Sequence, residues 1–248
     1  IFITMQLPKN KAIDAALKRQ THIDVLHIIK ECHSTVFANI PTFLGSMFLL
    51  LVGMMVLAMI LMSFFGITNP FEIAPELRMQ MEVLFAFVLA PLFTGLLMMG
   101  VRSANNKDIQ ALDIMTYLPR ILVLGVTSVF LSLWVTIGML LFLAPGLYLL
   151  ITTMFVLTLI VEKGLKPTAA IYLSIRIAHT YFWQMALFHG VFFLGFVLSV
   201  FTLGLGFLYV LPCYYVTKGK LYTELFGLDD IDVIDVLEAR KDDTTFEA

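Results

Sequence analysis

The sequence predicts an all-α, polytopic membrane protein. Of its 248 residues, 60% are hydrophobic and 14% are charged, whereas soluble domains average about 45–50% apolar and about 25% charged residues. The charges are also segregated, because four long runs contain no Asp, Glu, Lys or Arg: 32–71, 83–101, 121–161 and 177–217. Uncharged apolar runs longer than about 18 residues are typical of transmembrane helices. The chain is therefore predicted to be an integral membrane protein.

The lengths of these runs predict six transmembrane helices. One crossing of a hydrocarbon layer about 30 Å thick takes about 20 residues. The run 121–161 has roughly twice this length, and because unpaired backbone is costly in lipid, it must cross twice. The same reasoning divides 181–217 into two helices, where Gly204 and Gly206 supply a turn. The expected spans are about 41–65, 82–101, 120–142, 146–162, 181–201 and 204–217.

The turn inside the run 121–161 is expected at Pro145 and Gly146. Proline cannot continue the interior of a helix but suits its first turn, and glycine tolerates the backbone angles of a reversal. We therefore predict a helical hairpin turn at the membrane surface. A helix break that lines a cavity is the alternative.

The six spans follow a threefold pattern of architecture. A stretch of mixed polarity precedes each pair of spans, at 22–40, 107–119 and 167–182. The pattern predicts three αα-hairpins, each introduced by an amphipathic helix at the cytoplasmic interface. A plain six-helix bundle is equally consistent with it.

The basic residues predict the orientation of the chain. Fifteen of the sixteen Lys and Arg residues lie before the first span, after the last, or in the even-numbered loops, and Arg78 is the exception. Because cytoplasmic loops are enriched in Lys and Arg, both termini are predicted to be cytoplasmic. Residues 1–40 are then a cytoplasmic, interfacial segment, 41–222 the membrane domain and 223–248 a cytoplasmic tail.

The C-terminal tail is strongly acidic, with nine acids and two bases in 221–248. On a helix, its apolar side would carry Val233, Ile234 and Leu237. The acids around that side include Asp230, Asp232 and Asp235. This pattern suits a short helix that docks on a basic partner, and a solvated tail is the equally favoured alternative.

Residues 143–179, "LAPGLYLLITTMFVLTLIVEKGLKPTAAIYLSIRIAH", and 220–227, "KLYTELFG", carry a resemblance to a known group of proteins. Over roughly 105–227 the chain resembles the YciC-like and related bacterial inner-membrane proteins of unknown function. The shared pattern is a Pro-Gly turn, a span, an acid-Lys-Gly loop, a helix begun by proline, a hairpin and a closing Leu-Tyr segment. The resemblance implies a bacterial cytoplasmic membrane, and it brings no activity and no catalytic residues.

One ionisable residue, His189, is expected inside a span. Such residues often serve transport or proton relay, but a buried neutral histidine bonded to a neighbour is the favoured interpretation. His22, His27, Cys32 and His33 point in different directions on one helix, so no metal site is predicted. Cys32 and Cys213 are expected to fill apolar space.

The sequence contains none of the common catalytic motifs, such as HExxH, GxSxG or a P-loop. We therefore expect neither an enzyme nor a cofactor. Small residues inside the spans are expected to let helices approach closely. They are Gly45, Gly53, Gly95, Gly190 and Gly195.

A charged cluster is expected where the fourth span meets the cytoplasm. Glu162, Lys163 and Arg176 bracket this loop. Their opposite charges predict ion pairs that hold the helix 167–180 against the bundle. Binding of a lipid headgroup is the alternative role.

These features favour a non-enzymatic accessory or scaffold protein of the bacterial inner membrane. Its expected contacts are membrane lipids and either a membrane-protein partner or further copies of the chain, and no nucleic acid. The rival hypothesis is a transporter or channel for a neutral or amphipathic, lipid-like substrate. A continuous polar cavity would favour the rival, and a dry, tightly packed bundle would disfavour it.

Overall fold

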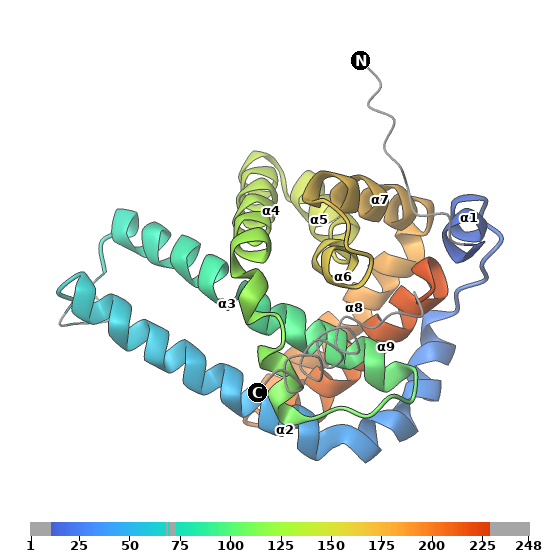
Figure 1. Cartoon of the computed structure of the whole chain (residues 1–248), viewed down its shortest axis with the longest axis horizontal. Coiled ribbons are helices and arrows are strands. Elements are labelled where there is room, and N and C mark those ends of the chain that lie inside the picture. The colour runs from blue at the N-terminus through green and yellow to red at the C-terminus, as the bar shows by residue number, and fades with distance from the viewer. Residues whose placement is uncertain (1–10, 68, 70–72, 229–248) are drawn as a thin grey trace, which may run out of the picture.

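The computed structural model of the chain describes residues 11–67, 69 and 73–228. Over these residues the structure consists of helices joined by loops and turns, without a strand (Figure 1). The α-helices are α1 (Lys11–Leu17), α2 (Val25–Phe64), α3 (Pro75–Ala104), α4 (Ile121–Leu141), α5 (Leu143–Thr152), α6 (Val156–Glu162), α7 (Pro167–Thr180), α8 (Phe182–Phe201) and α9 (Phe207–Phe226). Two short 3₁₀-helices, η1 (Ala111–Met115) and η2 (Leu118–Arg120), precede α4.

Five helical segments of the described chain are long and apolar enough to cross a membrane. They are Val25–Phe64, Glu76–Ala104, Ala111–Leu141, Leu143–Glu162 and Phe182–Phe201. This all-helical architecture is compatible with the multi-pass membrane class that the sequence predicts. Helix α9 is not among the five, and its second half carries Lys218, Lys220 and Glu224.

Helix α2 joins two segments that the sequence analysis had separated. It begins at Val25, where the carboxylate of Asp24 caps it by accepting hydrogen bonds from the Leu26 and His27 amides, both at 3.1 Å. It then continues through Pro41 to Phe64. A proline removes one helical hydrogen bond, and flanking helix-forming residues can carry a helix past it. The interfacial segment 22–40 and the first span therefore share one long helix.

Helices α4 and α5 form a tight hairpin. The chain reverses at Phe142, whose backbone is extended, and Pro145 and Gly146 follow in the first turn of α5. The predicted reversal thus lies just before the Pro-Gly pair and not at it, because proline fits a first helical turn. Gly146 is instead a point of close approach, since a β-carbon there would lie 2.5 Å from the backbone nitrogen of Met139.

The returning span, predicted as one helix over 146–162, is interrupted. Helix α5 ends at Thr152 and α6 begins at Val156. The Thr153 hydroxyl donates a hydrogen bond to the Leu149 carbonyl at 2.7 Å, and the buried Ser174 hydroxyl of α7 donates to the Thr152 carbonyl at 2.7 Å. Hydroxyl-to-carbonyl bonds of this kind compete with the helical pattern and satisfy the carbonyls that a break releases.

Helix α7 is amphipathic, as predicted for the stretch 167–182. Its exposed side carries Tyr172 and Arg176, and it packs against α5 and α6. Its buried side consists of Ala169, Ala170, Leu173, Ser174, Ile177 and Ala178. Because Ser174 bonds to the interruption between α5 and α6, this helix is part of the packed bundle.

Helices α8 and α9 form a second hairpin. The chain turns between Phe201 and Phe207, where Leu203 and Gly204 have φ angles of 53° and 88°. Glycine adopts such positive φ angles without steric cost. The turn lies at the glycine-containing segment that the sequence singles out.

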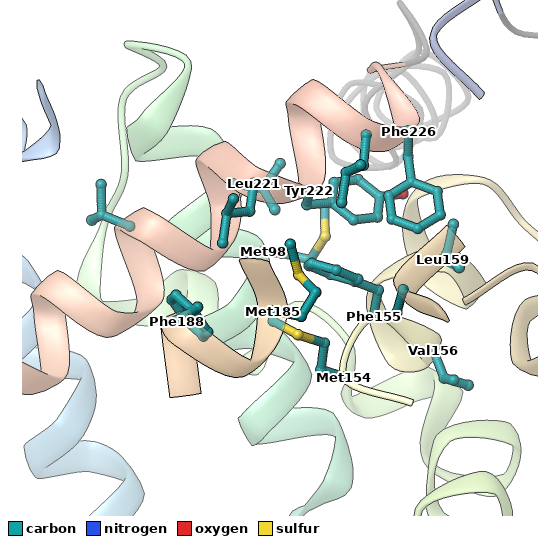
Figure 2. Packing of buried hydrophobic residues seen from close by; sticks show 14 of the residues in the cluster. Met98, Met154, Phe155, Val156, Leu159, Met185, Phe188, Leu221, Tyr222 and Phe226 are labelled. Atoms are coloured by element: carbon teal, nitrogen blue, oxygen red, sulfur yellow. The ribbon is translucent and has the colours of Figure 1, made fainter. Parts of the chain in front are cut away.

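Helix α9 lies at the centre of the fold and packs against α1, α2, α3 and α8. Close to its end, the rings of Tyr222 and Phe226 stack with 5.0 Å between centroids. The ring of Phe155, from the interruption between α5 and α6, contacts both of them (Figure 2). Met98 of α3 and Met185 of α8 complete this part of the core. The interrupted span is therefore anchored to α9.

Candidate functional site

Lys218 is a buried lysine in the second half of α9, with 8% of its surface exposed. Ion pairs within the described part of the chain include Arg102–Asp113, Lys163–Glu162 and Lys220–Glu31. Lys218 belongs to none of them. Its ammonium still has accessible surface, because Arg102 Nε and the Tyr181 hydroxyl are the fully buried side-chain polar atoms without a partner among the described residues. A largely buried lysine without a counter-charge is costly, so such a residue points to a functional site.

The ammonium of Lys218 lies back along α9, 5.6 Å from the ring centroid of Tyr214. The ring of Tyr214 in turn contacts Phe188 and Phe192 of α8, with 5.3 and 5.4 Å between centroids. His189 follows Phe188 on α8, and the centroids of these two rings are 5.3 Å apart. Two groups that can donate hydrogen bonds, the Lys218 ammonium and the Tyr214 phenol, therefore lie close to the part of α8 that carries His189.

His189 forms one hydrogen bond within its own helix. Its Nδ1 lies 2.8 Å from the carbonyl oxygen of Met185, so Nδ1 carries the proton in this contact. The other ring nitrogen, Nε2, is then the atom that can interact with a further group. Phe188 packs edge-on against the imidazole at 5.3 Å.

Lys218 was not predicted as a site residue. The sixth span was expected to end at residue 217, where the uncharged run stops, whereas α9 continues to Phe226. A window of about 20 residues starting at the Gly204–Gly206 turn would have included Lys218 inside the helix. The helical length needed for one crossing was therefore the signal that could have identified it.

Glu162 and Lys163 lie together at the end of α6, and both are buried there. The ammonium of Lys163 is 3.2 Å from Glu162 Oε1 and donates to the Gly227 carbonyl at 3.0 Å. The Tyr222 hydroxyl donates to Glu162 Oε2 at 2.5 Å. These bonds hold the end of α6 against the end of α9.

Arg176, the third member of the predicted charged cluster, lies elsewhere. Its guanidinium contacts Tyr172 on the exposed side of α7, with 3.4 Å between Nη1 and the phenol oxygen. Of the predicted cluster, the structure thus joins Glu162 to Lys163, whereas Arg176 contacts Tyr172. One turn of helix separates Tyr172 from Arg176, and the side of α7 that faces the bundle is apolar apart from Ser174.

A small polar pocket of about 210 Å³ lies between α2, the end of α3 and α9. Lys220 lies at its wall, and its ammonium is 3.3 Å from Glu31. Glu224 follows one turn later on α9, beyond the expected sixth span 204–217. Burial raises the pKa of the Glu224 carboxyl; Lys220 and His27 oppose this shift, and Glu31 adds to it.

An apolar cleft of about 510 Å³ lies between α2 and α3 and reaches α9. Methionines and aromatic rings dominate its walls: Met47, Met54, Met55, Phe85, Phe93 and Tyr215. Around it, α2 and α3 project from the rest of the molecule as a long hairpin (Figure 1). Only 6% of the most apolar window of α2 is buried inside the chain.

A second apolar groove, of about 490 Å³, lies between α4 and α7. Leu122, Val126 and Phe130 of α4 form one wall, and Pro167 and Ile171 of α7 form the other. Both large hollows are thus apolar surfaces of the kind that contacts acyl chains or other helices. Neither has the polar lining that a path for water-soluble solutes needs.

No metal site was predicted from the sequence, and an acidic docking helix was predicted in the C-terminal tail. Among the described residues, no group of three or more His, Cys, Asp or Glu side chains could hold a metal ion. Asp230, Asp232 and Asp235, the predicted acids of a docking helix, lie outside the residues that the structure describes.

No family model matches the chain, and comparison with curated proteins and with solved structures found no match either.

Proposed function

We propose that this chain is a non-enzymatic accessory or scaffold protein of the bacterial cytoplasmic membrane. Its partner would be a membrane protein, and the projecting α2–α3 hairpin would bind one transmembrane helix of that partner. The observation that carries the proposal is the exposure of α2, of which only 6% is buried over its apolar window.

The α2–α3 cleft has the composition of an adaptable binding surface. Methionine side chains are flexible and polarizable, so they repack around different shapes. Met54 and Met55 line the cleft from α2, and Phe85 and Phe93 line it from α3. In a bilayer, helices associate through close packing, because lipid tails are as apolar as the helices themselves. A cleft between two projecting helices offers a partner helix more contact than a single convex helix does.

The proposed placement in the membrane has six spans, with α9 contributing the sixth over about 204–217. Both termini and the even-numbered loops are placed in the cytoplasm, on the distribution of Lys and Arg. The bacterial cytoplasmic membrane rests on the resemblance to YciC-like proteins. With this topology, the α2–α3 turn is on the opposite side of the membrane from the Glu162–Lys163 pair.

Native mass spectrometry of the protein, extracted gently from its own membranes, tests the partner. We expect a stoichiometric second protein with the wild type. Met55→Trp fills the cleft and should remove that protein, whereas Met59→Trp, on the same helix outside the cleft lining, should retain it. Met55 and Met59 are 59% and 69% exposed, so neither change disturbs the core.

Two outcomes would contradict this function. A homo-oligomer without a second protein would mean that the cleft serves contacts between copies of the chain. Retention of the second protein by Met55→Trp would mean that the partner binds another surface, and the proposed role of the cleft would then be wrong.

A transporter or channel for a lipid-like, amphipathic substrate is the second candidate. The observation that favours it is the interrupted span Leu143–Glu162, since transporters often bind substrates at discontinuous helices. In this chain, Ser174 and the threonine hydroxyls satisfy the carbonyls at the interruption. Lipid transfer between the leaflets of proteoliposomes, lost in variants of the α4–α7 groove such as Val126→Trp, would favour this candidate over the scaffold.

A further inference from the structure

We propose that Lys218, together with Tyr214 and His189, forms a binding site for the phosphate group of an anionic phospholipid where α8 meets α9. The site is separate from the α2–α3 cleft and does not depend on the partner proposed there.

The charge of Lys218 needs an anion. The ammonium is on a side chain with 8% exposure, and within the described part of the chain no carboxylate lies within the 4.0 Å of an ion pair. The contact with Tyr214, at 5.6 Å, is a cation–π interaction. Such contacts offset only part of the loss of hydration around an ammonium. A bound anion would supply the missing counter-charge.

The neighbours of Lys218 point to an acceptor of hydrogen bonds. The ammonium has three N–H donors, and the Tyr214 phenol has one O–H donor. His189 uses Nδ1 on the Met185 carbonyl, which leaves Nε2 for a ligand. In the neutral imidazole Nε2 accepts hydrogen bonds, and it donates only when the ring is protonated. Phosphate oxygens match this set, because charge-assisted bonds from nitrogen donors to phosphate are strong.

The surroundings favour a phosphate that carries acyl chains. Lys218 is the first charged residue after the uncharged run 177–217, so it marks the level where the proposed sixth span meets the headgroup region. Its ammonium points back toward Tyr214, into the apolar half of α9. On α8, Trp183, Leu187 and Phe193 are exposed apolar residues that suit contact with acyl chains. A phospholipid can satisfy both parts of this surface at once.

Two variants of α9 test the proposal on the full chain in neutral detergent. Lys218→Met removes the proposed anion site, and Lys220→Met is the matched control, because Lys220 is paired with Glu31 and more exposed. Retention of dioleoylphosphatidylglycerol is measured by native mass spectrometry and by the shift in Tm. We expect Lys218→Met to bind the lipid about tenfold more weakly or worse. Lys220→Met should bind as the wild type, and Lys218→Arg should keep most of the binding.

Separate ligands identify the source of the phosphate. Dioleoylglycerol has the acyl chains without phosphate and should not stabilise the protein through Lys218. Inorganic phosphate alone tests for a soluble ligand. If inorganic phosphate raises the Tm of the wild type but not of Lys218→Met, and the lipid raises neither, the anion site belongs to a soluble phosphate compound. Equal binding of the lipid by Lys218→Met and Lys220→Met, with no effect of inorganic phosphate, would overturn the proposal.

A measurement on the wild type covers the case in which Lys218→Met does not fold. Phosphatidylglycerol with a photoreactive group in its headgroup should label α8 or α9, within 182–201 or 207–226. Excess phosphatidylglycerol should abolish this labelling, and excess dioleoylglycerol should not. Labelling confined to other helices would overturn the proposal without any variant.

Discussion

Gly219 of α9 packs against the backbone of Gly100 of α3 where these two helices cross. A β-carbon on Gly219 would overlap the backbone of Gly100 and Val101, and one on Gly100 would overlap the backbone carbonyl of Tyr215. Glycines allow this approach because they have no side chain, and close backbone contact is the main source of attraction between helices in a bilayer. The crossing fixes α9, and with it Lys218 and Tyr222, relative to α3.

Gly219→Ala should therefore destabilise the fold. The added methyl group forces α3 and α9 apart, which we expect to cost about 1–3 kcal/mol or more. Gly190→Ala is the matched control, because a β-carbon at Gly190 meets nothing within 4 Å. In α8 this control should be neutral or stabilising by up to about 1 kcal/mol, through helix propensity alone. Unfolding of both variants in mixed micelles measures the difference, and equal stabilities would contradict the packing described for the crossing.

Tyr222→Phe should loosen the junction between α6 and α9. The change removes the hydroxyl that donates to buried Glu162 and leaves the ring in the core. Loss of one partner from a buried, charged acceptor costs about 1–3 kcal/mol. Tyr172→Phe removes a hydroxyl from the exposed side of α7 and should change the stability by less than about 0.5 kcal/mol. If the two variants melt at the same temperature, the Tyr222 bond does not stabilise the fold.

Composition and charge runs were enough to predict an all-helical membrane protein, because lipid imposes long apolar helices. They also led us to expect turns near Pro145 and near Gly204. The ends of helices were harder to predict. The first span was expected to begin at residue 41, yet α2 begins at Val25 and continues through Pro41, and no residue pattern in 146–162 predicts the interruption after Thr152. At the interruption, the bond from Ser174 to the Thr152 carbonyl is a tertiary contact that no local pattern encodes.

The role of individual glycines could not be predicted either. Gly95 and Gly190 both read as small residues inside spans. A β-carbon at Gly95 would overlap the backbone of Ile114, whereas one at Gly190 would meet open space. Gly95 differs from Gly190 because η1 packs across α3 at Gly95. No pattern in the sequence of either segment predicts that η1 and α3 are in contact. Lys218 was missed for a related reason, since the end of a span was set by charge and not by helix length.

Ser174→Ala tests whether α7 stabilises the interruption between α5 and α6. The Ser174 hydroxyl is fully buried and donates to the Thr152 carbonyl at 2.7 Å. Without it, a buried carbonyl loses its partner, which we expect to cost about 1–3 kcal/mol. Hydrogen exchange should also rise locally at 152–156. Ser132→Ala, at an exposed position of α4, serves as the control and should leave both quantities unchanged.

The carboxyl of Glu224 should make stability depend on pH. Burial raises its pKa above the ordinary value of 4.5, so the folded state binds a proton more tightly than the unfolded state. Stability is then greatest when the carboxyl is protonated in both states, and it falls as the pH rises from about 4.5 through the raised folded-state pKa. Lys220 and His27 moderate this loss, and Glu31 adds to it.

Glu224→Gln should remove this dependence, because the amide does not titrate. At pH 7 the variant should be more stable than the wild type, and below pH 4.5 the two should converge. Unfolding midpoints between pH 4 and pH 8 in the same detergent measure the effect. Glu76→Gln, at an exposed position in the first turn of α3, is the control and should follow the wild-type profile. A wild-type stability that rises with pH through this window while Glu224→Gln stays flat would show that the Glu31–Lys220–His27 surroundings favour the charged carboxylate instead. Parallel profiles of the two proteins would show that Glu224 does not contribute to the pH dependence.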